Sequence, residues 1–378
     1  MPSFSMDYTR SAPRPIPGTA ARDEQEDDAC SLSSSPGSSW SSQVGSWGKH
    51  RRAVLFEGMR RLGSVSPNPN KGMSRFSSEG ALPRRGVWHL SKYTEKGIKH
   101  ATGWNEDRVV ALTDILAGQD DRPPLDVSLF AVCDGHGGSG SAEWVANEIA
   151  PRFAARFCSL HPSLSHLLDD ALVPKALSWA LEETLSAMAK EYLLLAEESG
   201  DTSGTTALVG VHCREWVVLG NLGDSVAMYY NDGQVGQEDP TISETARHSF
   251  HNVAERERCE GAGGVFQGGR LMGRLIPTRV IGDADVHALR PGVVGTTPEM
   301  RTIWVRPTTG MSFLVLCSDG VWDPLRIARV VREVRNGFRR QERRRETQGT
   351  VNIAASLVKA ALGKQLGDDA SAAVVLFR

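Results

Sequence analysis

The stretch SLFAVCDGHGGSG, residues 128–140, runs from apolar residues straight into an acid, a histidine and several glycines. Residues 129–133 carry no charge, which is typical of a strand buried in a core. Asp134 and His136 follow at once, and the glycines around them remove side-chain bulk. Because a buried strand is a rigid support, the stretch predicts a core strand that ends in a functional site.

The composition indicates a globular protein, with 40% hydrophobic and 23% charged residues in a chain of 378. A formal net charge of −2 gives no general attraction to nucleic acid or to an anionic membrane. No apolar run reaches the roughly 18 residues of a membrane span, and no apolar signal segment opens the chain. The acidic RDEQEDD at 22–28 argues against a transit peptide.

The six cysteines are scattered along the chain and form no CxxC pair. Cys133 and Cys317 each lie at the end of an apolar run, so we interpret them as buried thiols rather than as disulfide partners or zinc ligands. Thiols that stay reduced are typical of a reducing compartment. We therefore expect a cytoplasmic or nuclear protein.

The chain divides by composition at about residue 85. Residues 1–85 are rich in Ser, Pro and Gly with little periodic hydrophobicity, which predicts a disordered N-terminal tail. Its basic clusters at 49–52 and 60–61 are either part of a solvated tail or mark a docking or phosphorylation segment, since Ser64 and Ser66 follow closely. Residues 86–378 continue with strand and helix patterns to the end and form the predicted folded domain.

Apolar runs predict strands at 127–133, 206–213, 215–223, 312–318 and 370–377, and a hairpin at 225–236 with its turn at Asp232-Gly233. Helical spacing of apolar residues predicts helices around 145–153, 177–192 and 351–363. Clusters of strands interrupted by pairs of helices indicate an α+β protein in which sheets pack together and helices cover them.

Acidic residues recur at the ends of these predicted strands. Any one of them is explained by an Asp-Gly turn, but together they would repel one another unless cations neutralised them. Mg²⁺ and Mn²⁺ prefer oxygen ligands, and no cluster of His and Cys suggests zinc. Two such ions can activate a water and hold a phosphoryl group. The acids are Asp134, Asp224, Asp319, Asp323, Asp368 and Asp369, with Glu106 and Asp107 in GWNEDR.

At this point the sequence resembles a known family, the metal-dependent protein serine/threonine phosphatases of type 2C (PPM). The resemblance runs from about Gly86 to Arg378, and its motifs stand in the family's order. They are NEDR (105–108), FAVCDGHGG (130–138), SGTTALVG (203–210), NLGDSVA (221–227), ERERCEGAGG (255–264), TRVIGD (278–283), LCSDGVWD (316–323) and GDDASAAVVL (367–376).

The resemblance implies a four-layer α-β-β-α sandwich, with two central antiparallel sheets flanked by helices and a site for two Mg²⁺ or Mn²⁺ ions at one end. It implies that Asp134 bridges the metals, that the Gly135 carbonyl contacts one of them, and that Asp319 and Asp368 complete the protein ligands. Glu106, helped by Asp107, would hold metal-bound water. Asp224 and Asp323 would be supporting carboxylates or ligands of a third ion.

The resemblance also implies the reaction. A metal-bridging water attacks the phosphorus of a phosphoserine or phosphothreonine in a phosphorylated protein, without a phosphoenzyme. His136 would be the general acid that protonates the leaving oxygen, because an alkoxide is a poor leaving group. Asp283 stays open between a structural turn and a metal contact, and 245–280 resembles the family's helix and mobile flap. We expect a monomer.

Two departures from the family's pattern stand out. Thr102 occupies the position of an arginine that grips the substrate phosphate, and Lys99, His100 or Arg108 are candidates to replace it. Asp369 stands where an asparagine is usual and adds negative charge. The alternative to an active phosphatase is therefore a catalytically weak or inactive phosphatase-like regulatory or binding protein. Another metal hydrolase on the same frame stays open but has no feature in its favour.

The basic run RRQERRRE at 339–346 follows an apolar helix pattern around residues 327–334. We interpret it as a solvated helix face, with an anionic docking surface as the alternative. Nucleic-acid binding is not expected, because no aromatic residues are interleaved with the arginines.

Overall fold

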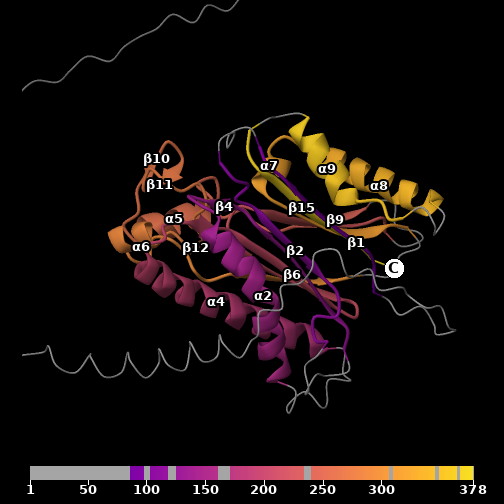
Figure 1. Ribbon diagram of the computed structural model, residues 1–378, viewed down its shortest axis with the longest axis horizontal. Helices are drawn as coiled ribbons and strands as arrows, with labels where there is room; N and C mark the ends of the chain where they lie inside the picture. Colours follow the sequence, from indigo (N-terminus) through magenta and orange to yellow (C-terminus); the bar gives the residue numbers. More distant parts are fainter. Residues whose placement is uncertain are drawn as a thin grey trace, which may run out of the picture. The chain divides into compact units, whose positions relative to one another are not determined.

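A computed structural model of the chain describes residues 86–97, 103–117, 125–160, 171–233, 240–305, 310–344, 349–363 and 367–377. The predicted tail at 1–85 lies outside these ranges, so the division of the chain at residue 85 stays a prediction. Thr102, Lys99 and His100 lie outside them as well. Figure 1 shows the described part, in which sheets form the centre and helices the outside.

The sheet that contains the opening stretch has five antiparallel strands among the described residues, in the order β13-β7-β6-β3-β2. The apolar run of the opening stretch forms β3, which pairs with β2 on one side and β6 on the other. It is therefore an interior strand. The strands are β2 (Arg108–Leu112), β3 (Val127–Cys133), β6 (Ala207–Cys213), β7 (Trp216–Leu222) and β13 (Glu299–Trp304).

A second sheet has five antiparallel strands in the described part of the chain, in the order β1-β15-β14-β8-β9. Its centre is β14, which pairs with β15 and β8. Strand β15 also pairs with β1, so it lies inside this sheet rather than at its edge. The strands are β1 (Val87–Glu95), β8 (Val226–Asn231), β9 (Thr241–Glu244), β14 (Ser312–Cys317) and β15 (Ala370–Phe377).

The two sheets pack face to face between two pairs of helices (Figure 1). The helices α2 (Gly140–Cys158) and α4 (Val173–Ser199) cover the sheet that contains β3. The helices α8 (Ile327–Arg343) and α9 (Ile353–Leu362) lie on the side of the other sheet. The predicted four-layer α-β-β-α sandwich is confirmed.

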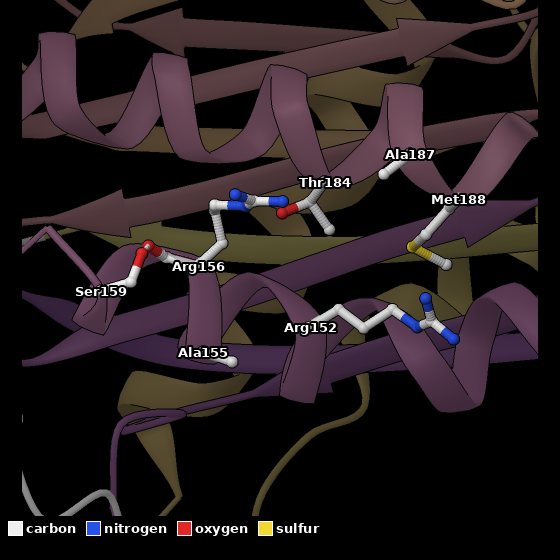
Figure 2. Close-up of a pocket in the computed structure, with 7 residues that line it drawn as sticks. All are labelled: Arg152, Ala155, Arg156, Ser159, Thr184, Ala187 and Met188. Atoms are coloured by element: carbon white, nitrogen blue, oxygen red, sulfur yellow. Dashed lines mark hydrogen bonds between the residues drawn. The ribbon is translucent and has the colours of Figure 1, made fainter. Parts of the chain in front are cut away.

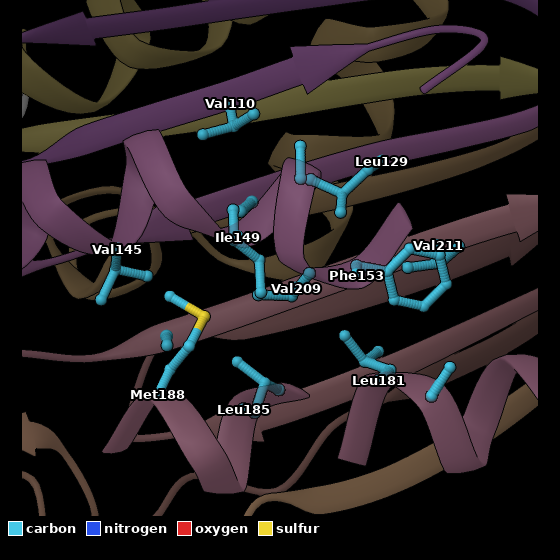
Figure 3. Close-up of a cluster of buried hydrophobic side chains, with 14 of the residues drawn as sticks. Val110, Leu129, Val145, Ile149, Phe153, Leu181, Leu185, Met188, Val209 and Val211 are labelled. Carbon is cyan, nitrogen blue, oxygen red and sulfur yellow. The ribbon is translucent and has the colours of Figure 1, made fainter. Parts of the chain in front are cut away.

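Strand β3 shows why its sequence is apolar throughout. Leu129 and Ala131 pack in the cluster beneath α2 and α4, whereas Phe130 and Val132 pack between the two sheets. Successive side chains of a strand point to opposite faces, so a strand with both faces covered needs apolar residues at every position. Figure 3 shows the first of these clusters, where Ile149 and Phe153 of α2 and Leu181, Leu185 and Met188 of α4 lie near Leu129, Val209 and Val211.

Several short elements connect the long strands and helices, and two of them, β4 and α7, contain His136 and Asp319. A small sheet has the order β12-β5-β4, and a two-stranded ribbon joins β10 and β11. The short elements are β4 (Gly135–His136), β5 (Gly204–Thr205), β10 (Phe266–Gln267), β11 (Arg270–Leu271), β12 (Ile281–Gly282), α5 (Val253–Gly261), α6 (Ala284–Leu289) and α7 (Asp319–Trp322).

The predicted core strands are present close to their predicted bounds, whereas α2 and α4 extend several residues beyond the predicted 145–153 and 177–192. The hairpin at 225–236 is different, because β8 ends at Asn231 and its partner β9 begins only at Thr241. Asp232 does not close a tight turn there; its carboxylate accepts a hydrogen bond from the Met311 amide at 2.9 Å. The five cysteines in the described ranges are buried and form no disulfide with one another, as expected. No described helix combines the length and apolar character that a membrane crossing requires.

Candidate active site

Asp134 directly follows β3, and its backbone is held by hydrogen bonds to Thr205 and Thr206. The Thr206 amide donates a hydrogen bond to the Asp134 carbonyl at 2.9 Å, and the Thr205 hydroxyl donates to the same oxygen at 3.1 Å. The Asp134 amide donates in turn to the Thr206 hydroxyl at 3.1 Å. The main chain that carries this carboxyl group is therefore fixed by strand pairing rather than left in a loose turn.

The predicted acids come together at one end of the sheets. Burial raises the pKa of Asp134 well above its ordinary value, and the charges of Asp107, Asp319, Asp224 and Asp368 raise it further. Such mutual effects require short distances between the carboxyl groups. Acids from the ends of β3, β7, β14 and β15 thus share one partly buried site.

The other buried acids show the same repulsion. Burial raises the pKa of Asp107 to about 7, with the charges of Asp369 and Asp319 adding to it. Burial and the charge of Asp319 raise the pKa of Asp224 to about 7. For Asp319, burial and the charges of Asp368 and Asp323 raise the pKa to about 6. Several acids are therefore held at a spacing that is unfavourable without a cation among them.

Asp369 has a structural role that the sequence did not indicate. Its carboxylate accepts hydrogen bonds from the amides of Gly97 and Glu106, each at 2.8 Å. These bonds bring the segment before β2 to the start of β15. A Cβ atom on Gly97 would lie 2.1 Å from the Asp368 carbonyl oxygen, and one on Gly135 would lie 2.4 Å from the Glu106 carbonyl oxygen. The Asp369 carboxylate thus holds Glu106 beside Gly135.

Asp107 is joined to the end of the other sheet through Ser318. The Ser318 hydroxyl donates a hydrogen bond to the Asp107 carboxylate at 3.2 Å. The Ser371 amide donates to the Ser318 hydroxyl at 3.0 Å. Because Ser318 directly precedes Asp319, these bonds fix the end of β14 against β2 and β15 at the point where the acids meet.

His136 and Asp283 form a pair across the small sheet. His136 pairs with Gly204 on one side, and Gly282 pairs with Gly204 on the other. The Nε2 atom of His136 lies 2.8 Å from Oδ2 of Asp283, which is almost fully buried. Burial by itself lowers the pKa of His136, but the hydrogen bond and charge of Asp283, with the charges of Asp224 and Glu106, raise it above its ordinary value.

The His136–Asp283 pair depends on a glycine between its members. A Cβ atom on Gly204 would lie 2.1 Å from Oδ2 of Asp283 and 2.4 Å from Nε2 of His136. Asp283 itself has a positive φ of 54°, which only a constrained position makes tolerable for a residue with a side chain. The carboxylate of Asp283 contacts His136 and its backbone forms the N-cap of α6, while the choice between a structural turn and a metal contact stays a prediction.

Two arginines near the acids have different surroundings. Arg108 donates from Nη1 to the carbonyls of Asn105 and Asp107, at 2.8 and 2.9 Å, and pairs through Nη2 with Glu143 at 3.1 Å. Arg247 pairs with Asp323, at 2.9 Å between Nη1 and Oδ1, and both side chains of this pair are partly exposed. Of the described acids, Asp323 thus differs from the buried group in having an arginine beside it.

The residue types fit Mg²⁺ or Mn²⁺. Within the described ranges, no group of three or more His, Cys, Asp or Glu side chains is arranged so that it could hold a metal ion as it stands. The donors at this site are nevertheless carboxyl groups, buried and raising one another's pKa, and hard divalent cations prefer such oxygen ligands. A cation among them would remove the repulsion that now raises those pKa values.

A separate cavity lies in the outer helical layer. It has a volume of about 350 Å³ and lies between α2 and α4. Figure 2 shows its lining, which comes from the two helices: Arg152, Ala155, Arg156, Ser159, Thr184, Ala187 and Met188. None of the acids at the strand ends lines this cavity, so the candidate active site does not include it.

The comparison with known protein families covers the part of the chain that carries these acids. The sequence profile of the family Protein phosphatase 2C matches residues 94–369, a range that contains all of the strand-end acids and His136. The chain belongs to the protein phosphatase 2C family. Membership places it among the metal-dependent protein serine/threonine phosphatases.

Relatives of the protein phosphatase 2C family match over most of the folded part. A probable protein phosphatase 2C of Oryza sativa subsp. japonica is 31% identical over 306 residues, which cover 75% of this chain and 83% of that relative. A probable protein phosphatase 2C of Arabidopsis thaliana is 28% identical over 295 residues, covering 75% of this chain and 65% of the relative. The chain thus spans slightly less than two thirds of the Arabidopsis protein.

Solved structures share the fold, and one of them is a protein phosphatase 2C. The serine-threonine phosphatase 2C of Toxoplasma gondii superimposes with a TM-score of 0.63 at 21% identity, over 79% of this chain and 96% of the other. A sex determining protein of C. elegans gives a TM-score of 0.63 at 20% identity, over 87% of this chain and 71% of the other. At these identities the likeness concerns the fold alone.

Proposed function

We propose that this protein phosphatase 2C chain hydrolyses phosphoserine and phosphothreonine in phosphorylated proteins at the site between β3, β7, β14 and β15. One observation carries the proposal: burial, and with it the charges of acids from the ends of separate strands, raises the pKa of Asp134. A chain that no longer held cations would gain stability by losing such acids. Their retention favours an active enzyme over an inactive phosphatase-like binding protein.

The proposed ligands are Asp134, the carbonyl of Gly135, Asp319 and Asp368, which would hold two Mg²⁺ or Mn²⁺ ions. When bound, these ions would lower the pKa of a water for in-line attack and neutralise the charge of the phosphoryl group. Asp369 supports the arrangement because its carboxylate fixes the Glu106 amide at 2.8 Å. We place Glu106, Asp107 and Asp224 around the two ions as carboxylates that accept hydrogen bonds from water.

Asp323 differs from the other acids in this proposal. Its carboxylate already has a cationic partner, because Arg247 lies 2.9 Å away. An arginine at this distance supplies part of the positive charge that a further cation would bring. We therefore propose two ions for this chain rather than three.

His136 is proposed as the general acid. Its Nε2–H donates to Asp283, so the proton available for transfer from the imidazolium lies on Nδ1. The Asp283 carboxylate orients the ring and favours its protonated form, which a general acid needs before the leaving oxygen departs. Asp283 thus acts through His136 as a positioning residue.

The phosphatase proposal is tested by phosphate release from a phosphothreonine peptide with Mn²⁺, using the wild-type chain and the Asp134→Asn and Asp319→Asn variants. We expect release by the wild type, and a loss of at least about a hundredfold in each variant because each removes a proposed ligand. His136→Ala should lose roughly 10²–10⁴-fold on the peptide, and much less on p-nitrophenyl phosphate, whose leaving group needs no acid.

Equal rates for the wild type and both aspartate variants would refute the proposal. An absence of release by the wild type at any Mn²⁺ concentration would favour the phosphatase-like binding protein instead. Full activity of His136→Ala on the peptide would remove the acid role from this histidine alone. The proposed cytoplasmic or nuclear location is supported by the five cysteines of the described ranges, which are buried and form no disulfide with one another.

A further inference from the structure

We propose that Arg247 binds the phosphoryl group of the substrate. The inference rests on the proposed phosphatase function, because it assigns a residue to the substrate of that same site. The family's pattern has an arginine before β2 that grips the substrate phosphate, but this sequence has Thr102 at that position. The phosphate therefore needs another partner. Arg108 is one of the candidates that the sequence suggested. Its guanidinium group is already bound to the carbonyls of Asn105 and Asp107 and to the carboxylate of Glu143.

The backbone places Arg247 at the site. The neighbouring His248 amide donates a hydrogen bond to the Gly223 carbonyl at 3.0 Å, next to Asp224 at the end of β7. The Asn252 side-chain amide donates to the Arg247 carbonyl at 3.1 Å. The Oδ1 atom of Asn252 caps α5 by accepting from the amides of Ala254 and Glu255. Arg247 is therefore anchored between the end of β7 and the start of α5.

The side chain of Arg247 reaches the end of the other sheet. Its Nη1 lies 2.9 Å from Oδ1 of Asp323. Asp323 lies one helical turn after Asp319, and its amide donates to the Asp319 carbonyl at 2.8 Å. Arg247 thus spans the gap between the two sheets beside the acids.

The guanidinium group of Arg247 has N–H donors that can bind a ligand. An arginine side chain offers five N–H donors, and within the described residues only Nη1 of Arg247 has a hydrogen-bond partner. The side chain is 40% exposed, so a substrate can reach it. A planar guanidinium binds phosphate oxygens through two parallel hydrogen bonds, which a lysine cannot do. The geometry therefore suits a phosphoryl dianion at the same site as the acids.

The simpler interpretation is that Arg247 only pairs with Asp323 in a surface salt bridge. Exposed ion pairs of this kind contribute little to stability. That interpretation predicts no effect on phosphate binding when Arg247 is replaced. Two measurements therefore distinguish the interpretations: the affinity for phosphate, and whether the substitution changes KM or kcat.

The test uses the full chain with Mg²⁺ and compares Arg247→Ala and Arg247→Lys with the wild type. Arg256→Ala is the matched control, since it removes the same charge from a residue of α5 that lies over the Phe250 ring, 5.4 Å from its centre. We expect Arg247→Ala to raise KM for a phosphothreonine peptide and the inhibition constant for inorganic phosphate about tenfold or more. Arg247→Lys should recover part of this loss, and Arg256→Ala should match the wild type.

Binding of inorganic phosphate is also measured by calorimetry, so that the inference is tested even without turnover. Weaker binding by Arg247→Ala with an unchanged melting temperature supports the inference. Phosphate affinity and KM within about twofold of the wild type would overturn it, as would a wild type that binds no phosphate. An inactive wild type whose phosphate binding depends on Arg247 would count against the proposed phosphatase activity and not against this assignment.

Discussion

Gly204 decides, at the scale of single residues, whether the proposed acid and its partner can meet. His136 and Gly282 flank it in the small sheet, and the space above it holds the contact of 2.8 Å between His136 and Asp283. A glycine is needed here for close approach of side chains rather than for an unusual φ. The motif SGTTALVG, which contains Gly204, could be recognised in the sequence, but the steric reason for the glycine could not.

Replacing Gly204 by Ala should abolish most of the activity. The new Cβ would lie 2.1 Å from Oδ2 of Asp283, so the pair must separate and His136 loses its orientation. We expect a fall in kcat of roughly a hundredfold or more on a phosphothreonine peptide, in line with the usual contribution of a general acid. Gly261→Ala in α5 is the control, since a Cβ there meets nothing within 4 Å.

A loss of fold in Gly204→Ala would leave the pair untested, so Asp283→Asn is measured beside it. Asparagine preserves the size of the side chain and a hydrogen bond to Nε2 but removes the charge. The same selective loss on poor leaving groups is expected, with a smaller magnitude. Unchanged kcat in Asp283→Asn, with Gly204→Ala folded and active, would contradict a role for this pair.

At the scale of elements, α5 is held to the site by one buried carboxylate. Glu255 is almost fully buried and accepts hydrogen bonds from Arg258 at 3.0 Å, from the Thr278 hydroxyl at 2.8 Å and from Arg279. Burial alone would raise the pKa of Glu255, but Arg279, Arg258 and Thr278 lower it from 4.5 to about 2. These contacts tie α5 to the segment that leads to Asp283.

This lowered pKa predicts how stability depends on pH. The charged form of Glu255 is favoured in the folded chain, so its contribution is complete above about pH 4.5 and is lost as the pH falls toward 2. The difference between 4.5 and about 2 corresponds to about 3 kcal/mol. Urea unfolding of wild type and Glu255→Gln should therefore differ most at neutral pH and converge as the pH falls.

The control for this prediction is Glu257→Gln, an exposed position on the same helix. It should leave the free energy of unfolding within about 0.5 kcal/mol at every pH. A difference between wild type and Glu255→Gln that stays constant from pH 7 to pH 3, or that grows as the pH falls, would contradict the proposed network.

At the scale of the whole molecule, the sandwich brings the ends of two sheets to one place. The layers beneath α2 and α4, between the sheets, and beneath α8 and α9 are filled with apolar side chains. This packing holds strands that are distant in sequence at fixed positions, so the acids cannot move apart to relieve their repulsion. The apolar layers thus stabilise an arrangement of charges that is unfavourable by itself.

The interior strands could be predicted from the sequence, because β3, β14 and β15 are covered on both faces and read as continuous apolar runs. The shorter strands β4, β5 and β12 have two residues each and no periodic pattern, so the pairing of His136 with Asp283 could not be predicted. The contact of Arg247 with Asp323 joins residues 76 apart and has no local signal.

The proposal that the strand-end acids hold cations is tested most directly by Mn²⁺ binding to the full chain, followed by calorimetry together with the melting temperature. Wild type should bind Mn²⁺ and melt at a higher temperature in its presence, because the ion removes the repulsion around Asp134. Asp134→Asn should bind at least about tenfold more weakly and gain little in melting temperature. Equal Mn²⁺ affinity in the two chains, or no binding by the wild type, would contradict the metal centre described here.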